Sequence, residues 1–108
     1  MTQDDAALVE RVLSGDKSAF GPLIDRHWPK ALSLALRSLG NLADAEDAVQ
    51  DAFVQALLGL PSLRKTSRFG PWLCGIVLNL CRMHKRAQRN GRVLEGGGYP
   101  EVGVWGDL

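Results

Sequence analysis

Apolar side chains recur every three or four positions along most of this chain, and that spacing is the strongest constraint on its fold. It is the spacing of one face of an α-helix. No stretch of four or more residues alternates convincingly between apolar and polar side chains, as a half-buried strand would. We therefore predict an all-α fold, a compact bundle of about four helices. The clearest stretch is predicted to be the third helix, with these inward side chains: Ala45, Ala48, Val49, Ala52, Phe53, Ala56, Leu57 and Leu60.

The first helix is marked by a capping residue at one end and a glycine at the other. Asp4 or Asp5 can accept hydrogen bonds from its first backbone N–H groups. Gly15 suits the left-handed turn that ends a helix. The side chains expected to be buried are Leu8, Val9, Val12 and Leu13.

The second helix is expected to begin near residue 16 or 18 and to run to about residue 39. Pro22 and Pro29 disturb it, because proline lacks an N–H and clashes with the carbonyl four residues earlier. We expect a late start, or a kink near residues 27 to 30. The expected inward side chains are Phe20, Leu23, Ile24, Ala31, Leu34 and Ala35.

The third and fourth helices have equally clear limits. Asn41 can cap the third helix, with Asp44 three positions later in an arrangement like a capping box, and Pro61 closes it. A loop from Ser62 to Arg68 follows, and the fourth helix is expected to fray beyond Gln88. Its predicted inward side chains are Phe69, Trp72, Leu73, Ile76, Val77, Leu80 and Met83.

Length and composition fit one small domain. With 108 residues, 45% of them hydrophobic and 23% charged, the chain resembles ordinary soluble domains. No apolar run approaches the ~20 residues needed to span a bilayer, and the N-terminus is acidic where a signal peptide is basic, so a cytoplasmic location is expected. We assign residues 1–90 to the helical domain and the Gly-rich residues 91–108 to a linker or disordered tail.

The residues that usually carry catalysis are scarce. His27 and His84 have no Ser, Cys or carboxylate partner at a telling spacing, and no phosphate-binding loop motif occurs, so we expect no enzyme and no cofactor. Cys74 and Cys81 are seven residues apart, or ~10 Å along one helix, which excludes a disulfide between them within it. Buried thiols are the favoured interpretation; a metal site that also includes His84 remains an alternative without a fourth ligand.

The charges are distributed unevenly. Residues 1–60 contain five Lys or Arg and nine acidic residues, whereas residues 61–108 contain eight and three. Such asymmetry indicates two partners of opposite character. On the outward face of the third helix, acidic and polar side chains stand in line with two apolar ones, which favours a protein-docking surface over a solvated face. This docking ridge consists of Asp47, Gln50, Asp51, Val54 and Leu58.

The second charged region lies between residues 64 and 92, where no acidic residue occurs. Guanidinium groups one helical turn apart can follow phosphates, so we predict a nucleic-acid interface. Positive charge that favours a helix C-terminus is the alternative, but it does not explain a basic loop before the helix. Trp72 and Phe69 are assigned to the core, and Trp28 is left open. The predicted nucleic-acid residues are Arg64, Lys65, Arg68, Asn79, Arg82, Lys85, Arg86 and Arg89.

Three strings in this order resemble region 2 of the bacterial RNA polymerase sigma factors, in the extracytoplasmic-function group. They are ALVERVLSGDKSAFGPLIDRH, LGNLADAEDAVQDAFVQAL and FGPWLCGIVLNLCRMHKR. The resemblance covers about residues 4–89. It implies that the docking ridge binds the clamp helices of the polymerase β′ subunit. It also implies that the Ser62–Arg68 loop and the helix after it hold the non-template strand of the minus-ten promoter element, with Asn79 near an unstacked base.

The sequence departs from the family's usual pattern at Gly21 and Pro22 and at Gly75. The family's second domain, a helix-turn-helix, is expected to be absent from this chain. An alternative function is a helical module that binds only protein, such as a sigma-like domain held by an anti-sigma factor. A helix-turn-helix repressor is a third possibility, but no tight turn precedes the basic helix.

Overall fold

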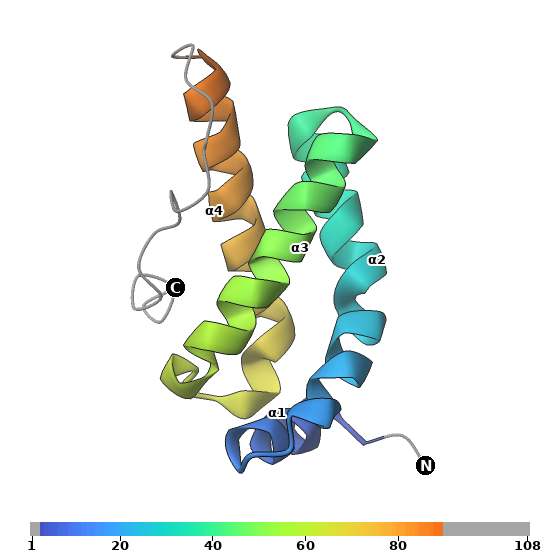
Figure 1. The fold of residues 1–108 in the computed structure, drawn as a ribbon, viewed down its shortest axis with the longest axis vertical. Helices are drawn as coiled ribbons and strands as arrows, with labels where there is room; N and C mark the ends of the chain where they lie inside the picture. The colour runs from blue at the N-terminus through green and yellow to red at the C-terminus, as the bar shows by residue number, and fades with distance from the viewer. Residues whose placement is uncertain (1–2, 90–108) are drawn as a thin grey trace.

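The computed structural model describes residues 3–89 and consists there of helices, with no strand among these residues (Figure 1). The prediction of an all-α fold is therefore confirmed. The predicted tail, residues 91–108, lies outside the described residues. Four α-helices follow one another: α1 (Asp5–Leu13), α2 (Phe20–Leu39), α3 (Leu42–Gly59) and α4 (Phe69–Arg89). Three short 3-10 turns join them: η1 (Lys17–Ala19), η2 (Leu60–Ser62) and η3 (Thr66–Arg68).

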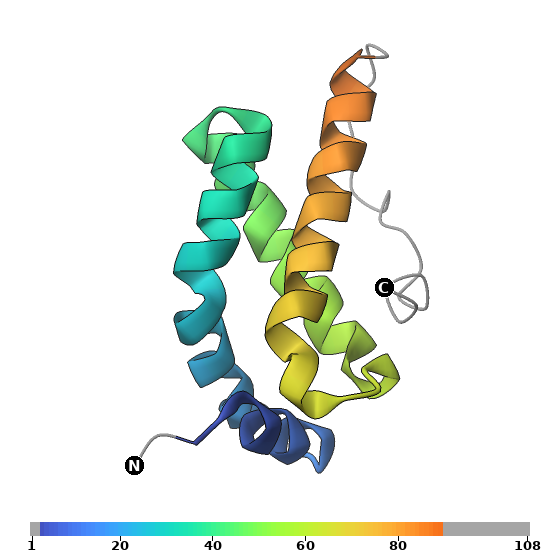
Figure 2. The same cartoon turned by 180° about the vertical axis from the view of Figure 1, so that it is seen from behind.

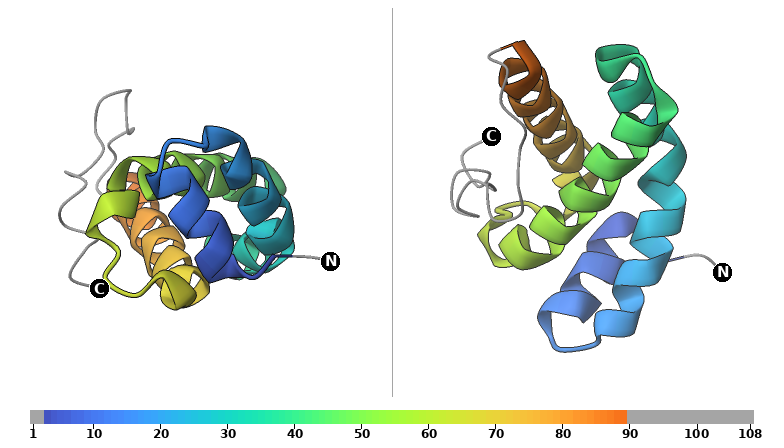
Figure 3. Two further views of the ribbon diagram at one scale, coloured as in Figure 1. Left: turned by 90° about the horizontal axis from the view of Figure 1, so that it is seen from below. Right: turned by 45° about the horizontal axis from the view of Figure 1, so that its top comes forward.

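The three long helices pack against one another, and α1 lies across one end of the group they form (Figures 1 and 3). α2 and α4 both start at the α1 end and lie side by side in the view from behind (Figure 2). α3 packs against both of them from the other side. α1 contacts α2, α4 and η3, so the turn before α4 is held against the first helix.

Aromatic rings join the three long helices near the α1 end. The ring of Phe20 in α2 meets Phe53 in α3 and Phe69 in α4, with ring centres 6.3 and 6.2 Å apart. Trp28, for which the sequence indicated no definite role, stacks on Phe53 with ring centres 6.0 Å apart and packs against the core. Phe69 and Trp72 are buried as predicted. Edge-on ring contacts of this kind add to the free energy gained by burying the rings.

Most predicted core positions are buried, and the exceptions have geometric reasons. Leu13 is 44% exposed, because α1 packs along a narrow edge formed by Leu8, Val9 and Val12. Gln55, a polar residue that was not among the predicted core positions, is only 4% exposed. Four predicted positions are partly rather than fully buried and pack against the core: Ile24, Leu34, Leu57 and Met83.

The predicted helix caps are present. Asp4 Oδ1 accepts a hydrogen bond from the Ala7 N–H at 2.8 Å, and Asn41 Oδ1 accepts one from the Asp44 N–H at 2.8 Å. Gly40 ends α2 in the left-handed conformation, with φ of 80°. The predicted late start of α2 is confirmed: it begins at Phe20, so Pro22 falls in the first turn, where an N–H has no partner within the helix.

α2 continues as an α-helix through Pro29. The alternative expectation of a kink at residues 27 to 30 stays a prediction. Within residues 3–89, none of the helices is both long enough and apolar enough to cross a bilayer.

Candidate docking and nucleic-acid surfaces

The docking ridge lies on the face of α3 that points away from the other helices. Val54 and Leu58 are 55% and 60% exposed, whereas Gln55 and Ala56 between them are buried. Asp47 and Gln50 are exposed and Asp51 is half-exposed. Since α2 and α4 both pack on the opposite face of α3, the fold leaves the ridge open. A surface of two carboxylates beside two apolar side chains can bind a basic and apolar protein surface.

The basic loop joins α3 to α4 at the α1 end of the domain. Arg64, Lys65 and Arg68 are all exposed there. The loop has a defined backbone, because the Arg68 N–H donates a hydrogen bond to the Lys65 carbonyl at 2.9 Å and η3 packs on α1. Among the described residues, these three side chains have no carboxylate partner. Their charges therefore remain available to an anionic ligand.

The basic side chains of α4 are exposed on its outer surface. Arg82, Lys85 and Arg86 are exposed, and Asn79 is half-buried. Arg82 Nη1 donates a hydrogen bond to Asn79 Oδ1 at 3.2 Å, so the asparagine oxygen is directed at the arginine. Arg89 belongs to α4 as its last residue, but its side chain is outside what the structure describes. The loop precedes the first residue of α4, whereas Arg82, Lys85 and Arg86 lie toward its other end, so the basic side chains are distributed along the helix.

Both histidines have carboxylate partners, which corrects the expectation drawn from sequence spacing. His27 Nε2 lies 2.8 Å from Asp5 Oδ2, and Arg26 Nη1 donates to Asp5 Oδ1 at 2.7 Å. His84 Nε2 lies 3.2 Å from Asp44 Oδ2, an ion-pair distance whose angles fall short of a hydrogen bond. No local motif could reveal these pairs, because the partners are on different helices.

The Asp44 carboxylate is stabilised in its charged form. The pKa of Asp44 is lowered, first by the hydrogen bond that Asn41 Nδ2 donates to Asp44 Oδ2 at 2.7 Å and then by His84. The same residues that cap α3 therefore also connect its first turn to α4.

The two cysteines are free thiols in different surroundings. Cys81 is buried and Cys74 is half-buried, so the buried-thiol interpretation holds fully for Cys81 and in part for Cys74. Burial raises the pKa of the Cys81 thiol, while a hydrogen bond with Ser38 and the charge of Lys85 act in the opposite direction. Within residues 3–89 no group of three or more His, Cys, Asp or Glu side chains is arranged to hold a metal ion.

Several known proteins with similar sequences are RNA polymerase sigma factors. The Sigma-70 region 2 family matches residues 23–91. The RNA polymerase sigma-H factor of Pseudomonas aeruginosa is 39% identical over 85 residues, which are 78% of this chain and 44% of that protein. The ECF RNA polymerase sigma-E factor of Escherichia coli K12 is 40% identical over 84 residues, again 78% and 44%. RNA polymerase sigma factor NccH of Alcaligenes xylosoxydans is 40% identical over 93 residues, 85% and 50%. The chain spans about half the length of these curated relatives, or slightly less.

Proposed function

Because the chain belongs to the sigma-70 region 2 family, we propose that it acts in transcription initiation by binding core RNA polymerase and promoter DNA. The observation that carries this proposal is the separation of two exposed surfaces on one small fold. The docking ridge is acidic and apolar, and the loop and outer face of α4 are basic. A bridging subunit needs one surface of each kind.

The docking ridge is the proposed contact with the clamp helices of the polymerase β′ subunit. Asp47, Gln50 and Asp51 supply polar contacts, and Val54 and Leu58 supply apolar area. Large exposed apolar side chains beside charges are typical of protein interfaces, where a few buried anchors carry most of the binding energy.

Binding to the isolated β′ clamp helices tests this half of the proposal. Asp51→Arg is expected to abolish binding, since it places like charge against a basic partner. Glu10→Arg, at an exposed acid on α1, is the matched control and is expected to leave the affinity unchanged. Equal affinity of the Asp51→Arg variant and the natural chain would contradict the proposed docking.

The basic loop and α4 are the proposed contact with the non-template strand of the minus-ten element. Arg64, Lys65 and Arg68 approach the strand from the loop, while Arg82, Lys85, Arg86 and Arg89 hold the backbone from α4, with Asn79 beside them. Phosphate contacts of this kind make binding depend on salt, because each one releases condensed counterions.

Strand binding at several salt concentrations, with and without core polymerase, tests the second half. The variant Arg82→Ala with Arg86→Ala is expected to weaken binding and to flatten its salt dependence. A salt response that is flat in the natural chain under both conditions would remove DNA binding from the proposal. It would leave the docking ridge as the only interface, as in a module held by an anti-sigma factor.

A further inference from the structure

α2 carries a stripe of basic side chains that no sequence motif singles out. Arg26, Lys30 and Arg37 are all exposed. At 3.6 residues per turn they lie within ~40° of one another around the helix axis. They belong to the half of the chain that is acidic by composition, so the charge count conceals them.

Contacts of α2 with its neighbours show which side this stripe occupies. His27 packs on the ring of Phe69, and a Cβ at Gly70 would lie 3.1 Å from His27 Cε1, so this edge of α2 faces the start of α4. Trp28 stacks on Phe53 in α3. The stripe lies ~80° from His27 and ~180° from Trp28 around the axis. It therefore borders α4 and turns away from α3.

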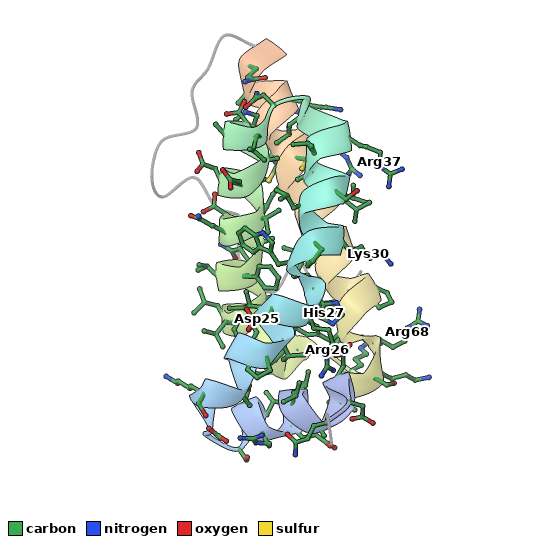
Figure 4. All side chains as sticks on the ribbon, turned by 90° about the vertical axis from the view of Figure 1, so that its right-hand side faces the viewer. Asp25, Arg26, His27, Lys30, Arg37 and Arg68 are labelled. Atoms are coloured by element: carbon green, nitrogen blue, oxygen red, sulfur yellow. The ribbon has the colours of Figure 1, made fainter. Side chains whose placement is uncertain are left out.

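α2 and α4 remain neighbours beyond this first contact. Nearer their far ends, Ser38 of α2 lies close enough to Cys81 of α4 to act on its thiol. Figure 4 shows Lys30 and Arg37 extending toward the same side of the molecule as Arg68, which stands at the end of the basic loop. Lys30, Arg37 and Arg68 thus share one side of the molecule.

The positive charge on this face is largely uncompensated. Within the described residues, Lys30, Arg37 and Arg68 have no ion-pair partner, and Arg26 alone is engaged, by Asp5 and by the Gln3 carbonyl. Asp25 also lies on α2, but ~120° around the axis from the stripe. Neither η3 nor α4 contains an acidic residue.

The acids at the two ends of the face are already occupied. Asp5 binds Arg26 and His27, and Asp44 binds Asn41 and lies beside His84. α4 also exposes apolar side chains: Leu78 is 42% exposed, and Pro71 is exposed. The α2 stripe therefore supplies spaced cations, and α4 supplies exposed apolar side chains.

We propose that the outer face of α2 and α4 is a second phosphate-binding track, on which Lys30 and Arg37 hold the backbone of a single nucleic-acid strand. The proposal rests on the proposed function, because the strand is the one received by the basic loop and α4. Lys30 and Arg37 are ~10 Å apart along the helix axis, so they suit a repeating anionic chain better than one compact carboxylate cluster. Bases of such a strand can lie against exposed apolar side chains of α4 such as Leu78.

The test measures binding of a fluorescein-labelled, mixed-sequence single-stranded oligodeoxynucleotide to the full chain as salt is raised. The variant Lys30→Ala with Arg37→Ala is expected to bind several-fold more weakly at low salt. The slope of the logarithm of its binding constant against the logarithm of the salt concentration should be shallower by ~1.4. This corresponds to ~0.7 for each lost phosphate contact on a single strand. Lys17→Ala, at an exposed lysine of η1 outside this face, is the control and should leave affinity and slope unchanged.

The Arg82→Ala and Arg86→Ala variant separates failure of this inference from failure of the proposed function. If that variant loses affinity while Lys30→Ala with Arg37→Ala matches the natural chain, the α2 track is wrong and the proposed function stands. If neither variant changes the salt slope, both are wrong. If Lys17→Ala weakens binding as much as the α2 variant, the effect is general charge, and the track is overturned. Circular dichroism of each variant excludes unfolding as the cause.

Discussion

His27 Nε2 lies 2.8 Å from Asp5 Oδ2, and this contact ties α2 to α1 at the end of the domain where the basic loop enters α4. Asp5 also binds Arg26, and His27 packs on Phe69 and against Gly70. Both side chains are largely shielded, with 17% of His27 and 22% of Asp5 exposed. One carboxylate therefore connects the first helix, the second helix and the start of the fourth.

Replacing Asp5 by alanine is expected to lower the free energy of unfolding by about 1 kcal/mol, because two hydrogen-bonded partners lose their acceptor. Urea denaturation measures the change. Asp25→Ala is the matched control: this carboxylate is exposed on α2 without a hydrogen-bond or ion-pair partner among residues 3–89, so the change should stay within ~0.5 kcal/mol. Equal effects of the two substitutions would show that the Asp5 contacts contribute nothing.

Gly70→Ala is expected to act through His27. An added Cβ would lie 3.1 Å from His27 Cε1, so the ring must move away from its place beside Asp5 and Phe69. The change that Gly70→Ala causes in the free energy of unfolding should therefore be more favourable in a His27→Ala background than in the natural chain, by at least ~0.5 kcal/mol. A double-mutant cycle from denaturation curves measures this coupling. Additive effects would mean that His27 accommodates the methyl group without cost.

Asp44 is expected to make stability depend on acid pH. Its folded-state pKa lies below the ordinary value of 3.8, chiefly because Asn41 donates a hydrogen bond to it. Because the pKa is lower in the folded state, the Asp44 charge stabilises the fold above pH 3.8. This stabilisation is lost as the pH falls through the pKa of the folded state. The natural chain should therefore exceed Asp44→Asn in stability at neutral pH and converge with it in acid.

Denaturation of both proteins across this pH range gives the comparison. In an Asn41→Ala background the pH-dependent part of the difference should shrink, because the first-ranking cause of the shift is removed. A difference that stays constant down to the most acidic pH would contradict the role given to the Asp44 charge.

The two thiols are expected to react at different rates. Cys81 is buried and its pKa is raised, so little thiolate forms and reagents cannot reach it, whereas Cys74 is half-buried. A disulfide reagent such as dithionitrobenzoate at mildly alkaline pH should modify Cys74 first and Cys81 only on unfolding. Cys74→Ser should remove the fast phase, and Cys81→Ser should retain it. Two equally fast phases in the folded protein would contradict the burial of Cys81.

The sequence by itself determined the helices and their faces, because these depend on a local period of 3.6 residues. Ala45, Val49 and Phe53 return to the same side of α3 whatever the helix packs against, so the opposite docking ridge follows from them. Asn41 and Gly40 mark helix ends through equally local effects, a side-chain hydrogen bond to the Asp44 N–H and a left-handed backbone conformation. The resemblance to sigma factor region 2 likewise depends on local sequence strings and not on how the helices pack.

Only the tertiary structure decided which residues of different helices meet. Asp5 and His27, or Asp44 and His84, are far apart in the chain, and their contacts depend on how the helices cross. The same packing turned the α2 stripe toward α4, so that Lys30 and Arg37 joined the basic face although composition placed them in the acidic half. Periodicity fixes the direction of a side chain relative to its own helix, whereas its neighbours are set by the long-range burial of apolar surface that brings the helices together.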